Sequence, residues 1–180
     1  PTSATGSPTF GWTRAVVSGI SEAANSGAGP VNEVLTNVSN VPVSVTYAYT
    51  TTAAGCSSTP QNVVVSVIPT PAVTDPADQF VCNGSNTALV NFTGTATVYD
   101  WTNNETSIGL AASGTGDIAA FPATNATSSP VVATVVVTPR YTLGATTCTG
   151  PTQTFTITVQ PSPSVDPISN QQICNGASTA

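Results

Sequence analysis

The four cysteines are the residues of this chain that could take part in the most kinds of chemistry, since thiols can form disulfides, bind metals or act as nucleophiles. They stand at positions 56, 82, 148 and 174 of 180 residues. The chain has no histidine and no C-x-x-C pair, so it lacks the spacing of a Cys/His zinc site. The absence of histidine and lysine also removes the Ser-His-Asp, Cys-His and Ser-Lys catalytic groups. Disulfides in an oxidising, extracellular compartment account best for the four thiols.

The pairing of these cysteines is open. Cys82 with Cys148 closes a loop within one repeat, and it leaves Cys56 and Cys174 to partners outside the fragment or in an adjacent repeat. In a sandwich, however, Cys82 and Cys148 would lie at opposite ends, roughly 20 Å apart, whereas a disulfide spans about 7 Å. Cys56 with Cys82 and Cys148 with Cys174, bonds between repeats, and free buried thiols remain as alternatives. The bond within the repeat is our first choice.

Carboxylates could support two other kinds of chemistry. Paired carboxylates hydrolyse glycosidic bonds, but Asp100, Glu105 and Asp117 each fit a solvated turn or a strand end more simply. We therefore expect a protein that is not an enzyme. Calcium requires six to eight oxygens, usually from several carboxylates, and each repeat junction supplies only one or two. We expect no cofactor, with calcium as the weaker alternative; the junction residues are Asp75, Asp78 and Asp166.

Composition narrows the possible partners. Only 6% of the residues are charged, and two arginines against eight carboxylates give a net charge of -6. Such a chain lacks the clustered Lys and Arg that nucleic acid binding needs. No apolar run approaches the roughly 20 residues of a membrane helix, so we expect a chain that does not span a membrane. The apolar content of 39% lies in Val-rich alternating runs, which indicates a folded protein.

An internal repeat sets the building unit. The segment 78–88, which contains Val-Cys-Asn-Gly, recurs 92 residues later at 170–180, each time after a Pro-x-Pro motif. Other matches are 88 or 89 residues apart, which indicates an insertion of about four residues near 139–142 in the later copy.

The repeat phase divides the chain into three parts. Residues 1–72 are the C-terminal part of one repeat, 73–164 a complete repeat and 165–180 the start of a third. The sequence is thus expected to be a slice of a longer array. We expect the first part to be stable only when preceding sequence or another chain supplies its first two strands.

Strand signals fill the complete repeat, because β-branched residues alternate with polar ones. Expected strands lie near 77–82, 87–93, 97–102, 106–111, 117–122, 131–138 and 153–160. Seven short strands in about 92 residues predict an all-β protein of tandem immunoglobulin-like β-sandwich repeats.

Aromatic residues have two expected roles. Trp12 and Trp101 occupy the same strand position in successive repeats, so we expect core side chains that fill the space between sheets. A sugar-stacking platform is the alternative use of these rings. Tyr99, Phe121 and Tyr141 are the candidates for surface contact.

Three stretches of the complete repeat carry a resemblance. They are Val98-Tyr-Asp-Trp-Thr-Asn-Asn104, Asp117-Ile-Ala-Ala-Phe121 and Phe155-Thr-Ile-Thr-Val159 with its Pro-x-Pro. This repeat resembles the PKD-like, immunoglobulin-like repeats of giant cell-surface adhesins of Bacteroidota, including mobile gliding adhesins. The acidic, Gly-rich turn that usually follows the Tyr-x-Trp motif is Thr-Asn-Asn-Glu here. The resemblance implies an extracellular, cell-surface location and a role in adhesion or gliding motility.

Three functions remain open. The first is a stalk or filament segment that binds polysaccharide or solid surfaces by many weak contacts and packs against neighbouring repeats of the same chain. The second is a carbohydrate-binding module. The third is self-association into a structural fibre, in which edge strands pair between chains because no lysine protects them.

Overall fold

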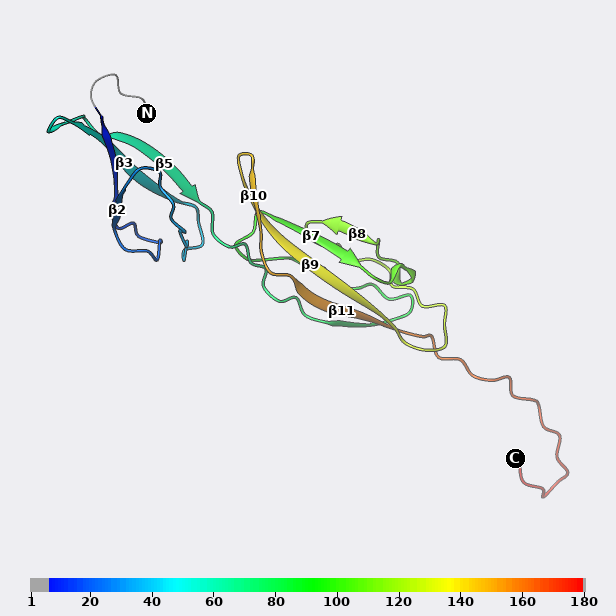
Figure 1. Ribbon diagram of the computed structural model, residues 1–180. Helices are drawn as coiled ribbons and strands as arrows, with labels where there is room; N and C mark the ends of the chain where they lie inside the picture. The colour runs from blue at the N-terminus through cyan, green and yellow to red at the C-terminus, as the bar shows by residue number, and fades with distance from the viewer. Residues whose placement is uncertain (1–6, 180) are drawn as a thin grey trace.

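Two β units follow one another along the chain, and an extended C-terminal segment comes after them (Figure 1). The structure is a computed structural model that describes residues 7–179. The all-β fold class is confirmed, with one β-sheet in each unit.

The first unit has five strands, with β3 at the centre of their pairing. β1 pairs with β2 on one side and β3 on the other, while β4 and β5 both pair with β3. All these contacts are antiparallel. The strands are β1 (Thr9–Arg14), β2 (Asn25–Ala28), β3 (Val43–Ala53), β4 (Cys56–Ser57) and β5 (Gln61–Val67).

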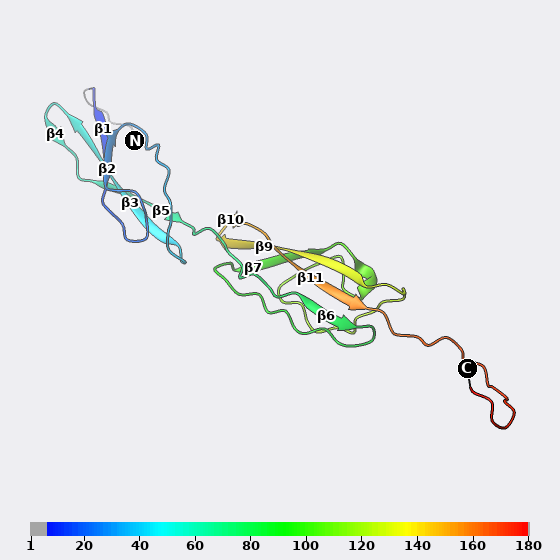
Figure 2. The ribbon, with the colours of Figure 1, turned by 90° about the horizontal axis from the view of Figure 1, so that it is seen from below.

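The second unit repeats this arrangement and adds one strand. Its sheet runs β6-β11-β9-β7-β8, and β10 pairs with β9. The added strand, β6, lies parallel to β11 along its outer edge (Figure 2). The elements are β6 (Gln79–Cys82), β7 (Val98–Asn103), the 3-10 helix η1 (Thr106–Ile108), β8 (Ser113–Thr115), β9 (Val131–Leu143), β10 (Thr146–Thr149) and β11 (Gln153–Gln160).

The two sheets share one register. Trp12 lies opposite Tyr49 in the first unit, as Trp101 lies opposite Val137 in the second. Val63 on β5 is opposite Tyr47, and its counterpart Phe155 on β11 is opposite Val135. Each position of the first sheet therefore has a structural equivalent in the second. The expected four-residue insertion lies in the β9–β10 hairpin, which is longer than the β3–β4 hairpin.

The second layer of the complete repeat is less regular than expected. The segments predicted as strands at 87–93 and 117–122 meet only at isolated bridges, Val90 with Ile118 and Asn86 with Pro122. The strand predicted at 106–111 is wrong, because the Glu105 side chain accepts a hydrogen bond from the Ser107 amide and begins a 3-10 turn. Gly109 ends that turn with a positive φ of 95°.

The two units differ in how much core they bury. Among the described residues, fourteen buried hydrophobic side chains form the core of the second unit, and four form that of the first. Val73, Val90 and Phe92, which precede β7, contribute to the larger core. The described part of the first unit has no equivalent of that segment, and its strand β5 is exposed along most of its length.

A glycine beneath each tryptophan makes this packing possible. A Cβ on Gly114 would overlap the ring of Trp101, and one on Gly27 would lie 2.9 Å from the ring of Trp12. Gly114→Ala should therefore destabilise the second unit by about 2 kcal/mol through overpacking. Urea unfolding followed by Trp101 fluorescence in a Trp12→Phe background measures this loss.

Ser113→Ala is the matched control, because this exposed neighbour lies on the same strand. We expect it to change the free energy of unfolding by less than about 0.5 kcal/mol. Equal stability of the two variants would contradict the packing of Trp101 on Gly114.

Candidate functional site

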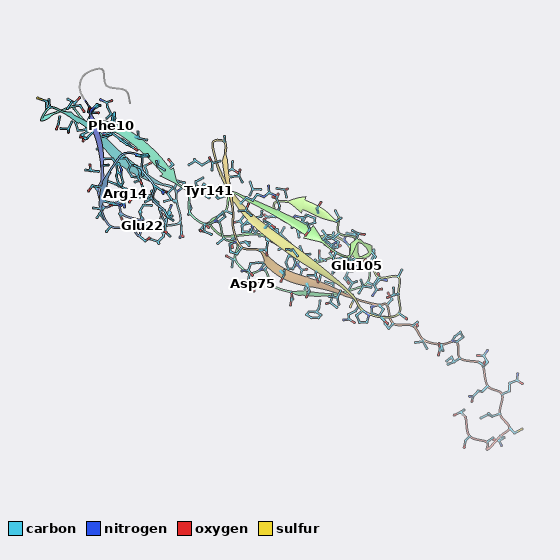
Figure 3. All side chains as sticks on the ribbon, viewed as in Figure 1. Phe10, Arg14, Glu22, Asp75, Glu105 and Tyr141 are labelled. Carbon is cyan, nitrogen blue, oxygen red and sulfur yellow. The ribbon has the colours of Figure 1, made fainter. Side chains whose placement is uncertain are left out.

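An apolar groove lies along β5 in the first unit. It has a volume of about 460 Å³ and is lined by Phe10, Gly29, Pro30, Tyr49, Gln61 and Val63. We call it the β5 groove. Figure 3 labels Phe10 at the end of the unit away from the second one. The groove has two aromatic rings and an amide, a set of groups that suits either a sugar or a peptide strand.

The complete repeat identifies what fits this groove. There, the Phe92 ring lies 5.8 Å from the ring of Tyr99 and 6.5 Å from the ring of Phe155. The Phe92 amide donates to Asp117 Oδ1 at 2.9 Å. Through the shared register, these three partners of Phe92 have equivalents in the first unit, all of which line the β5 groove. The equivalents are Phe10, Val63 and Pro30.

The β5 groove is therefore the place that a core segment occupies in the complete repeat. Val63 is 49% exposed, whereas its counterpart Phe155 is 2% exposed. Val65 is 41% exposed, and its counterpart Ile157 is fully buried. This geometry favours an extended segment with apolar side chains as the occupant.

A buried ion pair distinguishes the first unit from the second. Arg14 donates to Glu33 through Nε at 2.9 Å and Nη2 at 3.1 Å. Glu33 also accepts from the Tyr47 hydroxyl at 2.7 Å and from Asn25 Nδ2 at 2.7 Å. Arg14 is 2% exposed. Its other hydrogen bonds go to the backbone oxygens of the loop at 15–23.

The second unit holds the same loop without a charge. Asn103, the equivalent of Arg14, donates through Nδ2 to the backbone oxygens of Glu105, Leu110 and Ala111. In each unit, therefore, the last residue of the strand that carries the tryptophan holds the loop that follows. Arg14 does so after β1, and Asn103 does so after β7.

The ion pair shifts three pKa values. The hydrogen bonds from Arg14 and then from Tyr47 lower the pKa of Glu33 from 4.5 to about 2. Burial, and then the bond to Glu33, raise the pKa of Tyr47 from 10.0 to about 12. The hydrogen bond to Glu33 raises the pKa of Arg14. All three groups therefore keep this pairing across the neutral range.

The two tryptophans lie in the cores, as the repeat predicts. Trp12 is 6% exposed and Trp101 is 8% exposed, so neither presents a platform for sugar. Trp101 Nε1 donates to Gly116 O at 3.1 Å. Trp12 Nε1 is buried and has no hydrogen-bond partner within residues 7–179. This unpaired donor is a further sign that the first unit is incompletely packed.

The structure does not gather the proposed surface aromatics into one site. Tyr99 and Phe121 pack partly against the core of the second unit. Tyr141 lies on β9 opposite Cys148, close to the joint between the units (Figure 3). Tyr99 and Tyr141 are diagonal neighbours on one face of the sheet, and Phe121 comes from the other layer.

Each of the three carboxylates considered for catalysis has a structural partner instead. Asp100 pairs with Arg140 at 2.8 Å and accepts from the Thr115 hydroxyl. Asp117 accepts from the Phe92 amide, and hydrogen bonds from Ser107 lower the pKa of Glu105. Asp75 and Glu105 lie well apart in Figure 3. Within the described residues, no three His, Cys, Asp or Glu side chains lie together to hold a metal ion.

The disulfide predicted between Cys82 and Cys148 is not formed, and all four cysteines are free. Cys82 ends β6 beside Gln160, whereas Cys148 lies opposite Tyr141 at the other end of the sheet. About ten residues of β9 separate these levels, roughly 30 Å at 3.3 Å per residue. A disulfide spans only about 7 Å. Cys56 and Cys174 are exposed and also unpaired.

Residues 2–71 match the family model of the PKD-like domain. They form a PKD-like domain. The second unit repeats its sheet register, so the all-β structure with its two sheets is consistent with tandem PKD-like β-sandwich domains. No curated protein matches the chain. PKD-like domains are typical of extracellular surface proteins. No helix in residues 7–179 is both long enough and apolar enough to cross a membrane.

Sequence reasoning missed the β5 groove and the ion pair. Direct alignment of the two PKD-like domains would have indicated the groove, because Phe92 aligns with Ser3 at the 89-residue offset. Nothing in the local sequence indicates that Arg14 and Glu33 meet, since they are 19 positions apart, one at the end of β1 and the other in the loop after β2.

The β5 groove predicts that a copy of the core segment around Phe92 can occupy it. A chain in which a second copy of residues 73–97 replaces residues 1–8 should place the copied Phe92 in the β5 groove. We expect the first domain to gain about 3 kcal/mol of stability, the value of burying one large apolar side chain with its neighbours. Urea unfolding followed by Trp12 fluorescence in a Trp101→Phe background measures the gain.

The matched control is the same extended chain with the copied Phe92 replaced by Asp. It should lose most of that gain, because a carboxylate cannot be buried beside Phe10 and Val63. If both extended chains are no more stable than the original, the groove is not the place of this core segment.

The ion pair predicts that the first domain is sensitive to acid. Because folding lowers the pKa of Glu33 from 4.5 to about 2, its contribution is complete above pH 4.5 and disappears as the pH falls through 2. The melting temperature of the first domain should fall steeply between these values. Glu33→Gln should be less stable at pH 7 and show a shallower fall, in melts followed by Trp12 fluorescence. A wild-type profile that matches Glu33→Gln would contradict the pairing.

Proposed function

We propose that this chain is a non-enzymatic, extracellular segment of a large bacterial cell-surface protein, and that it acts in adhesion or gliding as a stalk with many weak contacts. The observation that carries the proposal is the packed joint between two PKD-like domains that stand end to end (Figures 1 and 2).

The joint is short and buried. Pro69 and Pro71 are fully buried, although they connect two separate sheets. Thr95 Oγ1 accepts from the Ala72 amide at 2.9 Å and donates to Thr70 O at 3.3 Å. A Cβ on Gly150 would overlap the carbonyl of Pro71, so this glycine allows the close approach. Proline restricts φ, and packing on the second domain restricts the joint further.

Such a joint supports a mechanical role. A stalk must stay extended to hold its tip away from its base, and a flexible linker would let neighbouring domains fold back on each other. The surface is rich in exposed Thr, Ser and Asn, whose hydroxyl and amide groups can hydrogen-bond polysaccharide or wet solid surfaces. Repetition of weak contacts along an array raises avidity without a single strong site.

Carbohydrate binding at the β5 groove is the second candidate, since Phe10, Tyr49 and Gln61 lie together there. The equivalence of this groove to the place of Phe92 argues against it. A sugar-stacking ring would have to remain available in the complete repeat, and there the equivalent space is filled by core side chains.

The packed joint predicts a rigid shape in solution. Pro69→Gly with Pro71→Gly should loosen the joint, so that the radius of gyration from X-ray scattering decreases and the scattering curve shows interdomain flexibility. Pro161→Gly with Pro163→Gly is the matched control, because it changes the same motif beyond the second sheet. An unchanged curve for the first pair would contradict a joint that is stiffened by these prolines.

Multivalent adhesion predicts a dependence on repeat number. Chains with one, two and four copies of residues 73–164 should bind polysaccharide-coated and bare glass with retention that increases steeply with copy number and little selectivity. Tyr49→Ala in the 180-residue chain tests the second candidate on a glycan panel. Selective glycan binding that this variant abolishes would replace the stalk with a carbohydrate-binding module.

A further inference from the structure

A polar groove lies in the second domain between two segments of the complete repeat, 74–79 and 88–93. Its volume is about 410 Å³, which is within the usual range of small-ligand sites. We call it the Asp75 groove. Asp75 lies at the edge of the second domain in Figure 3, so the groove can be reached from solvent.

Hydrogen bonds close the groove at both ends. At one end, the Thr74 amide donates to Thr93 O at 2.7 Å. At the other end, the Gln79 side chain takes the place of a paired strand. Its Nε2 donates to Ala88 O at 3.2 Å, and its Oε1 accepts from the Ala88 amide at 2.9 Å. Between these closures, no hydrogen bond joins 75–78 to 89–92 in the described structure, so the open space has fixed ends.

One wall of the groove presents an unpaired main-chain edge. The Val90 amide donates to Ile118 O, and the Phe92 amide donates to Asp117 Oδ1. Successive N–H groups of an extended strand point to opposite edges. The N–H and C=O groups of Asn91 therefore point toward 75–78. Neither the main chain nor the side chain of Asn91 has a hydrogen-bond partner within residues 7–179.

The other wall carries carboxylates without a cation. Asp75 makes no hydrogen bond or ion pair with another described residue. Asp78 accepts from the Thr156 amide at 2.6 Å through Oδ1. The chain has no lysine, and its two arginines, Arg14 and Arg140, are each ion-paired with another carboxylate. No basic side chain is therefore left to neutralise the groove.

These walls indicate the kind of ligand that fits. Leu89 is 60% exposed and lines the groove with Pro76, so an apolar surface stands beside the carboxylates and the Asn91 edge. A saccharide matches this combination, because its ring has C–H faces and a rim of hydroxyl groups. Two carboxylates without a counter-charge repel an acidic sugar and attract an ammonium group.

A metal ion fits the groove less well. Calcium requires six to eight oxygen ligands, usually from several carboxylates. The described residues contain no group of three His, Cys, Asp or Glu side chains that could hold a metal ion.

We propose that the Asp75 groove binds a saccharide unit that carries a free amino group. The ammonium group pairs with Asp75, with Asp78 as the second carboxylate, and the hydroxyl groups bond to the edge at Asn91. This inference rests on the proposed function and deepens it, because it names the chemical class of the polysaccharide and the place in the repeat that binds it.

Part of the groove recurs in the next copy of the repeat. The Asp-Pro pair at 75–76 and Gln79 have counterparts in Asp-Pro at 166–167 and Gln171. A weak site that recurs along an array gives the multivalent contact that a stalk requires.

Titration of the ¹⁵N-labelled full chain with a glucosamine tetramer, followed by NMR, tests the site. At mildly acidic pH, where the amino groups are charged, amide shifts should change at 74–79 and 88–93 with a Kd in the millimolar range. Asp75→Asn should weaken binding by about tenfold, because it removes a charge-assisted hydrogen bond. Asp75 is exposed and has no partner within residues 7–179, so this change leaves the fold intact.

Asp166→Asn is the matched control, because it makes the same charge change at an exposed residue beyond β11. It should leave the affinity unchanged. Shift changes confined to other parts of the chain, or equal affinities of the Asp75→Asn and Asp166→Asn chains, would overturn the site.

Two further tetramers test the chemical class. The N-acetylglucosamine tetramer should bind at least about tenfold more weakly, since it lacks the ammonium groups, and a galacturonate tetramer should not bind. Equal binding of either one would overturn the role of the amino group. Binding of the glucosamine tetramer that a metal chelator abolishes would also overturn the proposal, because it would assign the groove to a cation.

The outcomes for the groove and for the stalk can be told apart. Retention on surfaces that rises with repeat number, without tetramer binding in the groove, would remove the saccharide site and leave the stalk. Tetramer binding in the groove, with retention that does not depend on repeat number, would leave the site and remove the stalk.

Discussion

The pairing of β6 with β11 is the contact on which the rest of the domain depends. It covers the last strand of the sheet and brings the segment before β7 across the core, where Phe92 packs against Tyr99 and Phe155. Where this pairing is present, β11 is buried. Where the described residues lack it, the equivalent strand β5 is mostly exposed.

This dependence explains why two domains with one sheet register differ in their interiors. The first domain holds its loop with a charged pair, Arg14 and Glu33, where the second uses Asn103 and a fuller apolar core. A buried ion pair stabilises less than apolar packing of similar volume, since both charges must leave water. The first domain thus depends more on electrostatics than the second.

Much of the fold could be predicted from the sequence, because repetition and alternation are local signals. The strand at 153–160 and the core positions of Trp12 and Trp101 follow from them. The turn at 106–108 could not, since a single Glu105 side chain decides it against the β-branched pattern.

The candidate site was harder to predict. The cysteines were misread because a thiol pattern suggests a bond, although the strand arrangement expected from the sequence already placed Cys82 and Cys148 at opposite ends, as the structure does. The β5 groove depends on which segments pack against β5 in three dimensions, and local sequence patterns do not report this. Comparison of equivalent positions between two copies is therefore the useful method for a repeat chain.

One segment of the chain links the joint between the domains to the edge of the second sheet. The joint at Pro69 and Pro71 leads into β6, which completes the second sheet, so one segment connects the two domains and closes the later one. An array built this way gains length and stability from the same residues. Its surface stays polar and weakly charged, as suits contact with polysaccharide or wet solids.

Hydrogen exchange of the backbone amides at 61–67, followed residue by residue by NMR, tests the central claim most directly. These amides should exchange much faster than those at 153–160 in the same molecule, because within residues 7–179 β11 has a strand partner on both edges and β5 on one. Equal protection of the two strands in the monomer would contradict the account, since it would mean that β5 already has its second partner.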